Sequence, residues 1–401
     1  MHQPTSSISP RTDARILEQT SPPTRKMNKT QAIHGLLEYL EGKEYFFLTP
    51  TPETHALVDQ KLRKNDDVTA KCLTDVFGWS MEFEMPLEDF PESLLLKLRD
   101  ENLIQKKAEN RYWSTIRVST LYPPGPYLPS SSALPRNLYT HSAFPTHDQS
   151  AVFFGPDTYR FLRFMTQAYK HFGHLLPKDP IPQAADVGTG GGAGAIHLRH
   201  LLGRYARVYG LDLSPKAIEL AGINARYIFP LNTTGPAPPD FAESDILSGL
   251  PRPYPPSHPN FVPGVDREHD PGLDLLVCNP PYIASATQTY AAGGTAKSGL
   301  DLPLRILAEA LGEKGVRVGG MVWFYTGVPV PIRGRRKDMF YEEVEIMTAD
   351  GEGGKGYKWE VLEYDVMDVD IFGCEMETHE GPYKGIGRIQ AIGCVLQKVE
   401  V

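Results

Sequence analysis

The chain has few cysteines, no long apolar run and no excess of basic side chains. Its 401 residues include four cysteines, at positions 72, 278, 374 and 394, whose spacing matches neither a metal site nor a redox pair. No apolar run approaches the roughly 20 residues that a membrane span requires, and the polar N-terminus has no secretory signal. The net charge of −8 gives no long-range attraction to nucleic acids or anionic membranes. We therefore expect a cytoplasmic protein with reduced thiols, no membrane partner and a substrate other than nucleic acid.

The N-terminal third divides into a polar tail and a first folded unit. Residues 1–30 are rich in Ser, Thr and Pro, which predicts a disordered tail. Residues 31–121 predict a helical or winged-helix-like domain, which would either bind DNA or cover the active site of a larger domain. Acidic residues between Glu82 and Asp89 favour the covering role, because a DNA groove would repel them. Helices are expected at 32–41, 52–63, 69–77 and 90–98, and a strand at 112–121.

A Pro- and Ser-rich linker leads into a second, larger domain. Residues 122–155 hold this linker and a hairpin or extended segment. From 156 to 401, strand and helix signals alternate, which predicts an α/β fold with a mostly parallel sheet. Two stretches, 230–272 and 331–356, are rich in Pro, Gly or charge and are expected to be surface insertions.

A glycine-rich turn joins the first predicted strand of this domain to a helix. The segment reads Asp186-Val187-Gly188-Thr189-Gly190-Gly191-Gly192, and the helix is expected at 195–202. Glycines at 188, 190 and 192 allow backbone angles that are closed to other residues, and they let a ligand contact the main chain. Because nucleotide-binding dehydrogenases use a related turn, this segment alone does not identify the ligand.

Acidic residues follow the next two predicted strands. Asp212, with Leu213 after it, ends the strand at 206–211, where a doubly wound fold places a carboxylate beside ribose hydroxyls. Asp245 and Ile246 lie where a third strand would end, so the carboxylate could accept from an adenine amino group while Ile246 packs on the ring. An N-cap before a short helix explains Asp245 nearly as well.

An apolar strand at 273–278 runs directly into Asn279-Pro280-Pro281-Tyr282. Two prolines fix the backbone and remove two N–H donors, which leaves carbonyl oxygens free to accept hydrogen bonds. The Asn279 side chain and the Pro280 carbonyl could hold both N–H bonds of a planar amino group, and Tyr282 offers an aromatic face. The nitrogen lone pair would then point at an electrophilic methyl group, so catalysis would rest on positioning and on hydrogen bonds to the developing charge. A rigid turn after a core strand is the alternative explanation.

Together, the glycine-rich turn, Asp212 and the Asn-Pro-Pro-Tyr turn resemble class I methyltransferases. Within that class they resemble the HemK-type family, whose members methylate a glutamine of peptide-chain release factors. Two flanking segments are also similar to the family's, Gly155-Pro156-Asp157-Thr158 and Gly299-Leu300-Asp301. The resemblance covers about 150–330, and it implies a Rossmann-like methyltransferase fold with a seven-stranded sheet and S-adenosyl-L-methionine as the cofactor.

The resemblance also implies roles for individual residues, and no metal site is expected. The catalytic turn comprises Asn279, Pro280, Pro281 and Tyr282. The expected cofactor contacts are Asp186, Gly188, Thr189, Gly190, Gly192, Asp212, Leu213, Asp245, Ile246 and Asn279. The candidate substrate-side residues are Asp157, Tyr159, Tyr290, Lys297 and Asp301.

The predicted function is methyl transfer from S-adenosylmethionine to an amide or amine nitrogen of a small molecule or protein. A nucleic acid N-methyltransferase acting on adenine N6 or guanine N2 would use a similar turn on a flipped base, but the acidic balance argues against it. A non-catalytic, cofactor-binding scaffold would not need an intact Asn-Pro-Pro-Tyr turn. A nicotinamide dehydrogenase would leave that turn unexplained.

Overall fold

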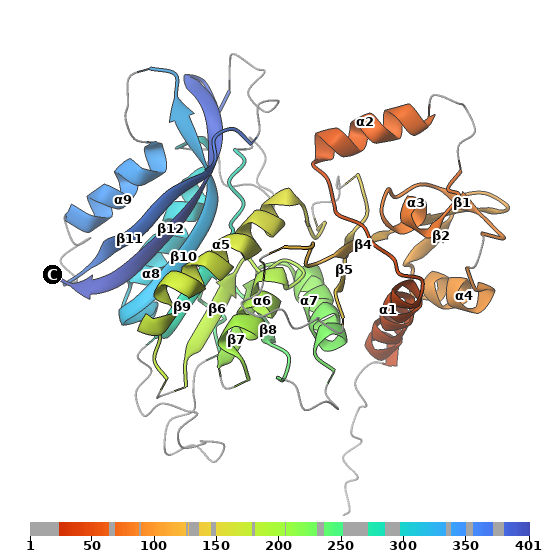
Figure 1. Cartoon of the computed structure of the whole chain (residues 1–401), viewed down its shortest axis with the longest axis horizontal. Helices are drawn as coiled ribbons and strands as arrows, with labels where there is room; N and C mark the ends of the chain where they lie inside the picture. The colour runs from red at the N-terminus through yellow and green to blue at the C-terminus, as the bar shows by residue number, and fades with distance from the viewer. Residues whose placement is uncertain are drawn as a thin grey trace, which may run out of the picture.

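The computed structural model has two lobes, which are joined by a two-stranded ribbon (Figure 1). The first lobe is an N-terminal module of helices and a small sheet, and the second, which we call the sheet domain, is built around a large sheet. The residues that the structure describes are 24–63, 69–87, 90–125, 127, 136–145, 150–178, 181–204, 206–230, 236–251, 272–284, 297–333, 338–349, 356–371 and 381–401.

The N-terminal module packs four helices around a three-stranded antiparallel sheet of order β1-β3-β2. Apolar side chains of α1 and α4, among them Leu36 and Leu98, are fully buried between the helices and this sheet. The elements are α1 (Thr24–Gly42), α2 (Pro52–Arg63), α3 (Leu73–Phe77), β1 (Phe83–Glu84), α4 (Glu92–Asp100), β2 (Ile104–Lys106) and β3 (Arg111–Ser114).

The ribbon that joins the lobes pairs β4 (Ile116–Thr120) with β5 (Leu138–Ser142) in antiparallel register. Every residue of both strands is buried. The expected extended segment after the linker contains β5, which pairs with β4, and the Ser142 amide at its end also donates to the Val152 carbonyl at 3.1 Å.

The large sheet has seven strands in the order β11-β12-β10-β9-β6-β7-β8. Of these seven, β12 alone runs antiparallel to its neighbours, and the other pairs are parallel. The prediction of an α/β fold with a seven-stranded, mostly parallel sheet is confirmed. The strands are β6 (Gln183–Val187), β7 (Arg207–Asp212), β8 (Asp240–Glu243), β9 (Leu273–Cys278), β10 (Val316–Pro331), β11 (Tyr357–Asp368) and β12 (Ile386–Glu400).

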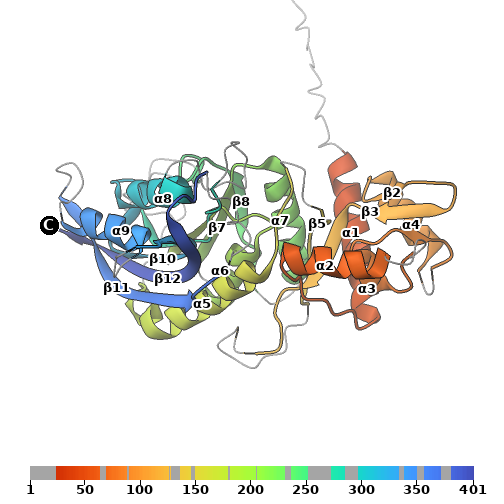
Figure 2. The same ribbon diagram turned by 90° about the horizontal axis from the view of Figure 1, so that it is seen from above.

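Helices cover both faces of the large sheet, as Figure 2 shows for α5 on one side and α8 and α9 on the other. In β9, Leu275 and Val277 join the core under α5, α6 and α7, whereas Leu276 and Cys278 join the core under α8 and α9. This alternation explains why residues 275–278 form one continuous apolar run. The helices are α5 (Pro156–Phe172), η1 (Gly173–Leu175), α6 (Ala193–Leu202), α7 (Pro215–Ile228), η2 (Lys297–Gly299), α8 (Asp301–Leu311) and α9 (Met339–Ala349). Among the described helices, none is long and apolar enough to cross a membrane.

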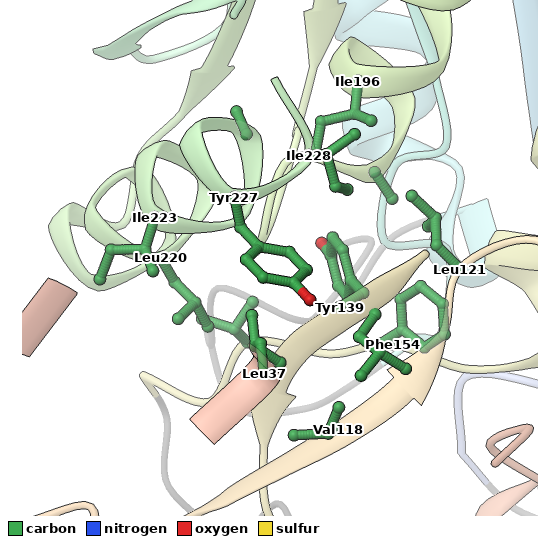
Figure 3. Close-up of a cluster of buried hydrophobic side chains, with 14 of the residues drawn as sticks. Leu37, Val118, Leu121, Tyr139, Phe154, Ile196, Leu220, Ile223, Tyr227 and Ile228 are labelled. Atoms are coloured by element: carbon green, nitrogen blue, oxygen red, sulfur yellow. The ribbon is translucent and has the colours of Figure 1, made fainter. Parts of the chain in front are cut away.

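The two lobes share one apolar core where α1 and the ribbon meet α6 and α7 (Figure 3). Leu37 from α1 lies beside Ile223 and Tyr227 of α7 in this cluster. Polar contacts border it: the His34 ring lies 2.9 Å from the Ile223 carbonyl, and the Tyr227 hydroxyl donates to Glu41 at 3.1 Å. The lobes are therefore packed together and not merely tethered by the linker.

The N-terminal tail prediction is wrong for residues 24–30, which belong to α1. The Lys29 ammonium pairs with Glu219 of α7 at 2.6 Å, so docking on the sheet domain supports the N-terminal part of this helix. The strand expected at 112–121 is two strands, β3 and β4, which belong to different sheets. The helix expected at 69–77 is shorter and begins at Leu73.

The insertion predicted at 331–356 is wrong for residues 339–349, which form α9. Phe340, Val344 and Met347 recur at helical spacing and are buried against the sheet, while the charged residues between them remain outside. Within the insertion predicted at 230–272, residues 236–251 contain β8 and a turn, and residues 231–235 and 252–271 lie outside the described residues.

Candidate functional site

The carboxyl ends of three neighbouring strands place the predicted motifs on one edge of the sheet. Val187 of β6 pairs with Leu211 of β7 on one side and with Cys278 of β9 on the other. Because these strands are parallel, the residues that follow them all emerge at the same edge. Gly188, Asp212 and Asn279 are therefore brought together, as the sequence predicted.

The glycine turn adopts backbone angles that favour glycine. Gly188, Gly190 and Gly192 have φ values of 72°, 54° and 95°. A Cβ at Gly188 or Gly190 would meet no atom within 4 Å, so the space in front of both residues is open. At Gly192 a Cβ would lie 3.0 Å from the Cβ of Ala221, so this glycine instead allows the turn to pack on α7.

Asp186 lies beneath the turn and is only 2% exposed. Its Oδ2 accepts hydrogen bonds from the Thr189 hydroxyl at 2.6 Å and the Ala195 amide at 2.9 Å. Burial raises the pKa of Asp186 to about 7, against the effect of these two hydrogen bonds. The carboxylate thus fastens the turn to the start of α6, and its predicted contact with a cofactor stays a prediction.

Asp212 closes the turn from the neighbouring strand. Its Oδ2 accepts from the Gly190 amide at 2.8 Å and its Oδ1 from the Ser214 amide at 2.9 Å. Burial raises the pKa of Asp212, and the backbone hydrogen bonds oppose this shift. The adjacent Leu213 is 53% exposed.

The turn after β8 exposes Asp245 and buries Ile246. Ile246 has a φ of 52° and is 5% exposed, and its carbonyl accepts from the Ser244 hydroxyl at 2.7 Å. Asp245 forms an ion pair with Arg305 of α8 at 2.6 Å, and both side chains are half exposed. Sequence reasoning missed Arg305, because the contact joins segments 60 residues apart.

The Asn-Pro-Pro-Tyr turn has an exposed and a buried side. Asn279 and Pro281 are partly exposed, whereas Pro280 and Tyr282 are buried. The Tyr282 ring lies over Gly327 of β10, where a Cβ would come within 2.3 Å of two ring carbons. The ring therefore packs on the sheet with one face, and this glycine makes room for it.

A buried carboxylate holds Tyr282 in place. Asp157, at the start of α5, is 6% exposed and accepts hydrogen bonds from the Tyr282 hydroxyl and, at 3.0 Å, from the Tyr325 hydroxyl. Arg160 pairs with Asp157 at 3.0 Å and with Asp368 at 2.8 Å. Asp157 was predicted beside the substrate; in the structure it accepts a hydrogen bond from Tyr282 of the Asn-Pro-Pro-Tyr turn. Sequence reasoning missed Tyr325 and Arg160.

Tyr159 faces away from this carboxylate and toward the N-terminal module. Its hydroxyl donates to the Thr120 carbonyl at 3.1 Å and accepts from the Thr49 amide at 3.3 Å. The structure therefore does not bring Tyr159 together with Asp157, two residues earlier on the same helix.

The segment before α8 packs against the Asn-Pro-Pro-Tyr turn. A Cβ at Gly299 would lie 2.1 Å from the Tyr282 carbonyl, so glycine is required for this approach. Beyond the turn, the Ala284 amide donates to the Tyr383 hydroxyl at 2.7 Å. Asp301 begins α8, and its buried Oδ2 has no hydrogen-bond partner in the described part of the chain. Tyr290 and the Lys297 side chain lie outside the described residues.

The described residues contain no cluster of His, Cys, Asp and Glu that could hold a metal ion. Cys278 is buried at the end of β9, and burial raises the pKa of its thiol. This thiol donates to the Val187 carbonyl at 3.0 Å and so has a structural partner. Cys374 lies outside the described residues.

Comparison with known proteins gives a sequence relative for part of the chain. No family model matches the chain. Over 102 residues the chain is 39% identical to a release factor glutamine methyltransferase from Moorella thermoacetica. The match covers 25% of this chain and 28% of that protein, so the chain spans less than a third of the relative's length. The resemblance to release-factor glutamine methyltransferases is confirmed over this stretch.

Solved structures also overlay on the chain. The ribosomal protein L11 methylase from Lactobacillus delbrueckii subsp. bulgaricus is 14% identical, with a TM-score of 0.33 over 60% of this chain and 80% of that chain. TYW2 from P. horikoshii, in complex with MeSAdo, is 11% identical, with a TM-score of 0.37 over 72% of each chain.

Proposed function

We propose that this chain is an S-adenosyl-L-methionine-dependent N-methyltransferase, acting on an amide or amine nitrogen of a small molecule or a protein. The observation that carries the proposal is the common edge of β6, β7 and β9, where the glycine turn, Asp212 and Asn279 meet. The partial match to a release factor glutamine methyltransferase supports it.

The residues at this edge fit the proposed cofactor. The open space before Gly188 and Gly190 admits a ligand to the main chain of the turn. Each oxygen of Asp212 accepts one amide hydrogen bond and retains capacity for another, which suits two ribose hydroxyls. The buried Ile246 and the exposed Asp245 suit the apolar face and the amino group of an adenine.

The bound cofactor would supply an electrophilic methyl group on its sulfonium. The side-chain oxygen of Asn279 and the carbonyl of Pro280 would accept the two N–H bonds of the acceptor and orient its lone pair. Asp157 would act through Tyr282 to hold the turn, and so it is a positioning residue. No general base is needed before transfer, because the proton can leave after the nitrogen has become positive.

The acceptor we favour is a carboxamide of the glutamine type. A planar –NH2 group offers two donors, which match the two acceptor oxygens of the turn. Adenine N6 and guanine N2 amines share this chemistry, and the net charge of −8 disfavours a nucleic acid carrier. We further propose a cytoplasmic location, which the free thiols Cys278 and Cys394 support.

The test is replacement of Asn279 by Ala. We expect methyl transfer to be lost while the affinity for S-adenosylmethionine stays within about tenfold, since one hydrogen bond contributes roughly 1 kcal/mol. Methyl transfer is measured as tritium that passes from labelled cofactor to the protein, nucleic acid and small-molecule fractions of an extract. Calorimetry measures the affinity for the cofactor.

Two results would contradict the proposal. A wild-type chain that does not bind S-adenosylmethionine has no such cofactor, and an Asn279→Ala variant with a near-normal rate removes Asn279 from the mechanism. Label found mainly in nucleic acid would replace the favoured acceptor with the alternative one.

A further inference from the structure

One face of the β4–β5 ribbon carries a row of polar side chains. Arg117 pairs across the ribbon with His141, and Ser119 pairs with Tyr139, so all four side chains share this face. The Ser119 hydroxyl lies 2.9 Å from the His141 Nε2. At one end of the row Tyr139 packs on the glycine turn, where a Cβ at Gly191 would lie 2.4 Å from its hydroxyl oxygen.

Arg117, at the other end of the row, is a buried cation without a carboxylate partner among the described residues. The side chain is 4% exposed, and burial lowers its pKa to about 10. Its Nε donates to the Gly78 carbonyl at 2.8 Å, and its guanidinium lies 5.3 Å from the centre of the Phe47 ring. Its buried Nη2 has no hydrogen-bond partner in the parts of the chain that the structure describes.

His55, from the first turn of α2, has the same deficit. It is 2% exposed, and its Nδ1 has no hydrogen-bond partner within the described residues. The Trp79 carbonyl bonds to its ring, and burial together with the charge of Arg117 lowers its pKa to about 4. Gly78 and Trp79 are consecutive, so two adjacent carbonyls hold Arg117 and His55 beside each other.

An unpartnered Nη2 on a buried guanidinium, beside an imidazole nitrogen that also has no partner within the described ranges, requires an explanation. A buried ion without a counter-charge destabilises a fold by several kcal/mol, and buried polar atoms almost always have partners. A guanidinium matches a two-oxygen anion with parallel N–H bonds, and an imidazole that takes up a proton beside a bound anion donates from both nitrogens. We propose that Arg117 and His55 form a binding site for an oxyanion, a carboxylate or a phosphate group.

Helix α2 provides the way in. Of its side chains from Pro52 to Leu62, only His55 is buried, and Leu57 is 57% exposed. Figure 1 shows α2 lying along the outside of the module, away from its other helices. An outward movement of the start of α2 would therefore expose the site, while Leu62 near the other end of the helix packs against the core. This inference does not rest on the proposed methyltransferase activity.

The test uses inorganic phosphate and acetate as probes, with chloride at matched ionic strength as the reference. A bound anion raises the melting temperature of the full chain by mass action, and calorimetry gives its dissociation constant. We expect Arg117→Met to weaken binding at least tenfold and His55→Phe to weaken it several-fold. Arg99→Met is the matched control, because Arg99 also lies over a ring of this module, 5.6 Å from the centre of Tyr112. It should leave binding unchanged.

The two probes separate the two ligand chemistries. Stabilisation by acetate alone assigns the site to carboxylates, and stabilisation by phosphate alone assigns it to phosphate groups. If neither anion stabilises the wild-type chain more than chloride, or if Arg117→Met responds as the wild type does, the proposal is overturned. If Arg117→Met fails to fold, Arg117→Lys replaces it, because lysine keeps the charge but lacks the planar guanidinium. Anion binding that is unchanged in both Arg117→Lys and His55→Phe would also overturn the proposal.

Discussion

Among single residues, Asp157 holds the Asn-Pro-Pro-Tyr turn, whose catalytic role is proposed above, through the hydroxyl of Tyr282. It accepts from Tyr282 and Tyr325 and pairs with Arg160, so three elements converge on one carboxylate. An Asn at position 157 offers one acceptor oxygen. Its amide –NH2 is a donor and would face the tyrosine hydroxyls and the guanidinium, which also donate. We expect Asp157→Asn to lower the rate of methyl transfer at least tenfold, about 1.4 kcal/mol, while the cofactor dissociation constant changes less than twofold.

A second buried aspartate provides the control for that variant. Asp338 is also 6% exposed and accepts from a tyrosine hydroxyl, that of Tyr364 at 2.8 Å, but it lies before α9 and outside the site. Asp338→Asn should lower the melting temperature without lowering the rate constant. Equal losses of rate in the two variants would show that Asp157 acts only through stability.

The buried His200 makes the stability of the folded protein depend on pH. Burial lowers its pKa to about 4, from 6.5 in an unfolded chain, and its Nε2 has no partner among the described residues. Between pH 4 and 6.5 the unfolded chain binds a proton that the folded chain does not, so stability falls as pH drops through this window. We expect His200→Phe to recover about 2 kcal/mol at pH 5 relative to pH 8.

Urea unfolding of both proteins at the two pH values measures this recovery. The pH dependence of the unfolding free energy will not vanish in His200→Phe, because His55 and His197 are also buried with lowered pKa values. His174→Phe, at an exposed position of η1, should leave this pH dependence as it is in the wild type. If the unfolding free energy of wild type and of His200→Phe changes equally between pH 8 and pH 5, the pKa of His200 is not lowered in the folded protein.

At the scale of elements, the two ends of α6 carry comparable glycines with different neighbours. Gly190 precedes the helix with a φ of 54°, Gly203 follows it with a φ of 72°, and a Cβ at either would meet nothing within 4 Å. Alanine is strained at both positions, by about 1–3 kcal/mol. We expect only Gly190→Ala to weaken S-adenosylmethionine binding, by about tenfold or more in calorimetry, because the open space there is where the ligand would lie.

Gly203→Ala is the control for strain. It should lower the melting temperature at least as much, since its ψ of −167° is closed to alanine, and it should leave the affinity unchanged. If Gly190→Ala binds the cofactor as the wild type does, the open face of the turn is not the binding surface.

Elements that satisfy local rules could be predicted from the sequence. The run 275–278 is apolar throughout because both faces of β9 are covered, and the glycines of the turn predict its positive φ angles. Helix α2 is bounded as predicted, by Pro52 and Arg63. The placement of the motifs on one edge followed from parallel strand order alone.

Elements that depend on distant partners could not be predicted in this way. The N-terminal part of α1 is docked on α7 through Lys29, and Tyr282 contacts Asp157 across 125 residues of sequence. No residue near Tyr282 in the sequence indicates that its hydroxyl is hydrogen-bonded. The sequence therefore predicted an aromatic face open to the substrate, whereas the ring is buried. The charged surroundings of α9 concealed a helical spacing at 340, 344 and 347 that was present in the sequence.

At the scale of the whole molecule, one continuous core runs through both lobes. Residues of α1 and α4 belong to the same buried cluster as residues of α5, α6 and α7, and Figure 3 shows the part of it where Leu37 of α1 meets α7. A shared core of this kind couples the lobes, because neither can unfold without exposing apolar surface of the other. We therefore expect the module and the sheet domain to unfold in one transition.

Four tryptophans allow this expectation to be measured, two in each lobe. Trp79 and Trp113 belong to the module, and Trp323 and Trp359 to the large sheet. Variants that keep only one pair report each lobe separately during urea unfolding.

Leu98→Ala, which removes a fully buried side chain of α4, should cost about 2–5 kcal/mol. If the core is cooperative, this change in the module lowers the midpoint reported by the sheet tryptophans as much as that reported by the module pair. A sheet midpoint that stays at the wild-type value would show two independently folding lobes, and Leu37→Ala at their junction should then be far less costly than Leu98→Ala.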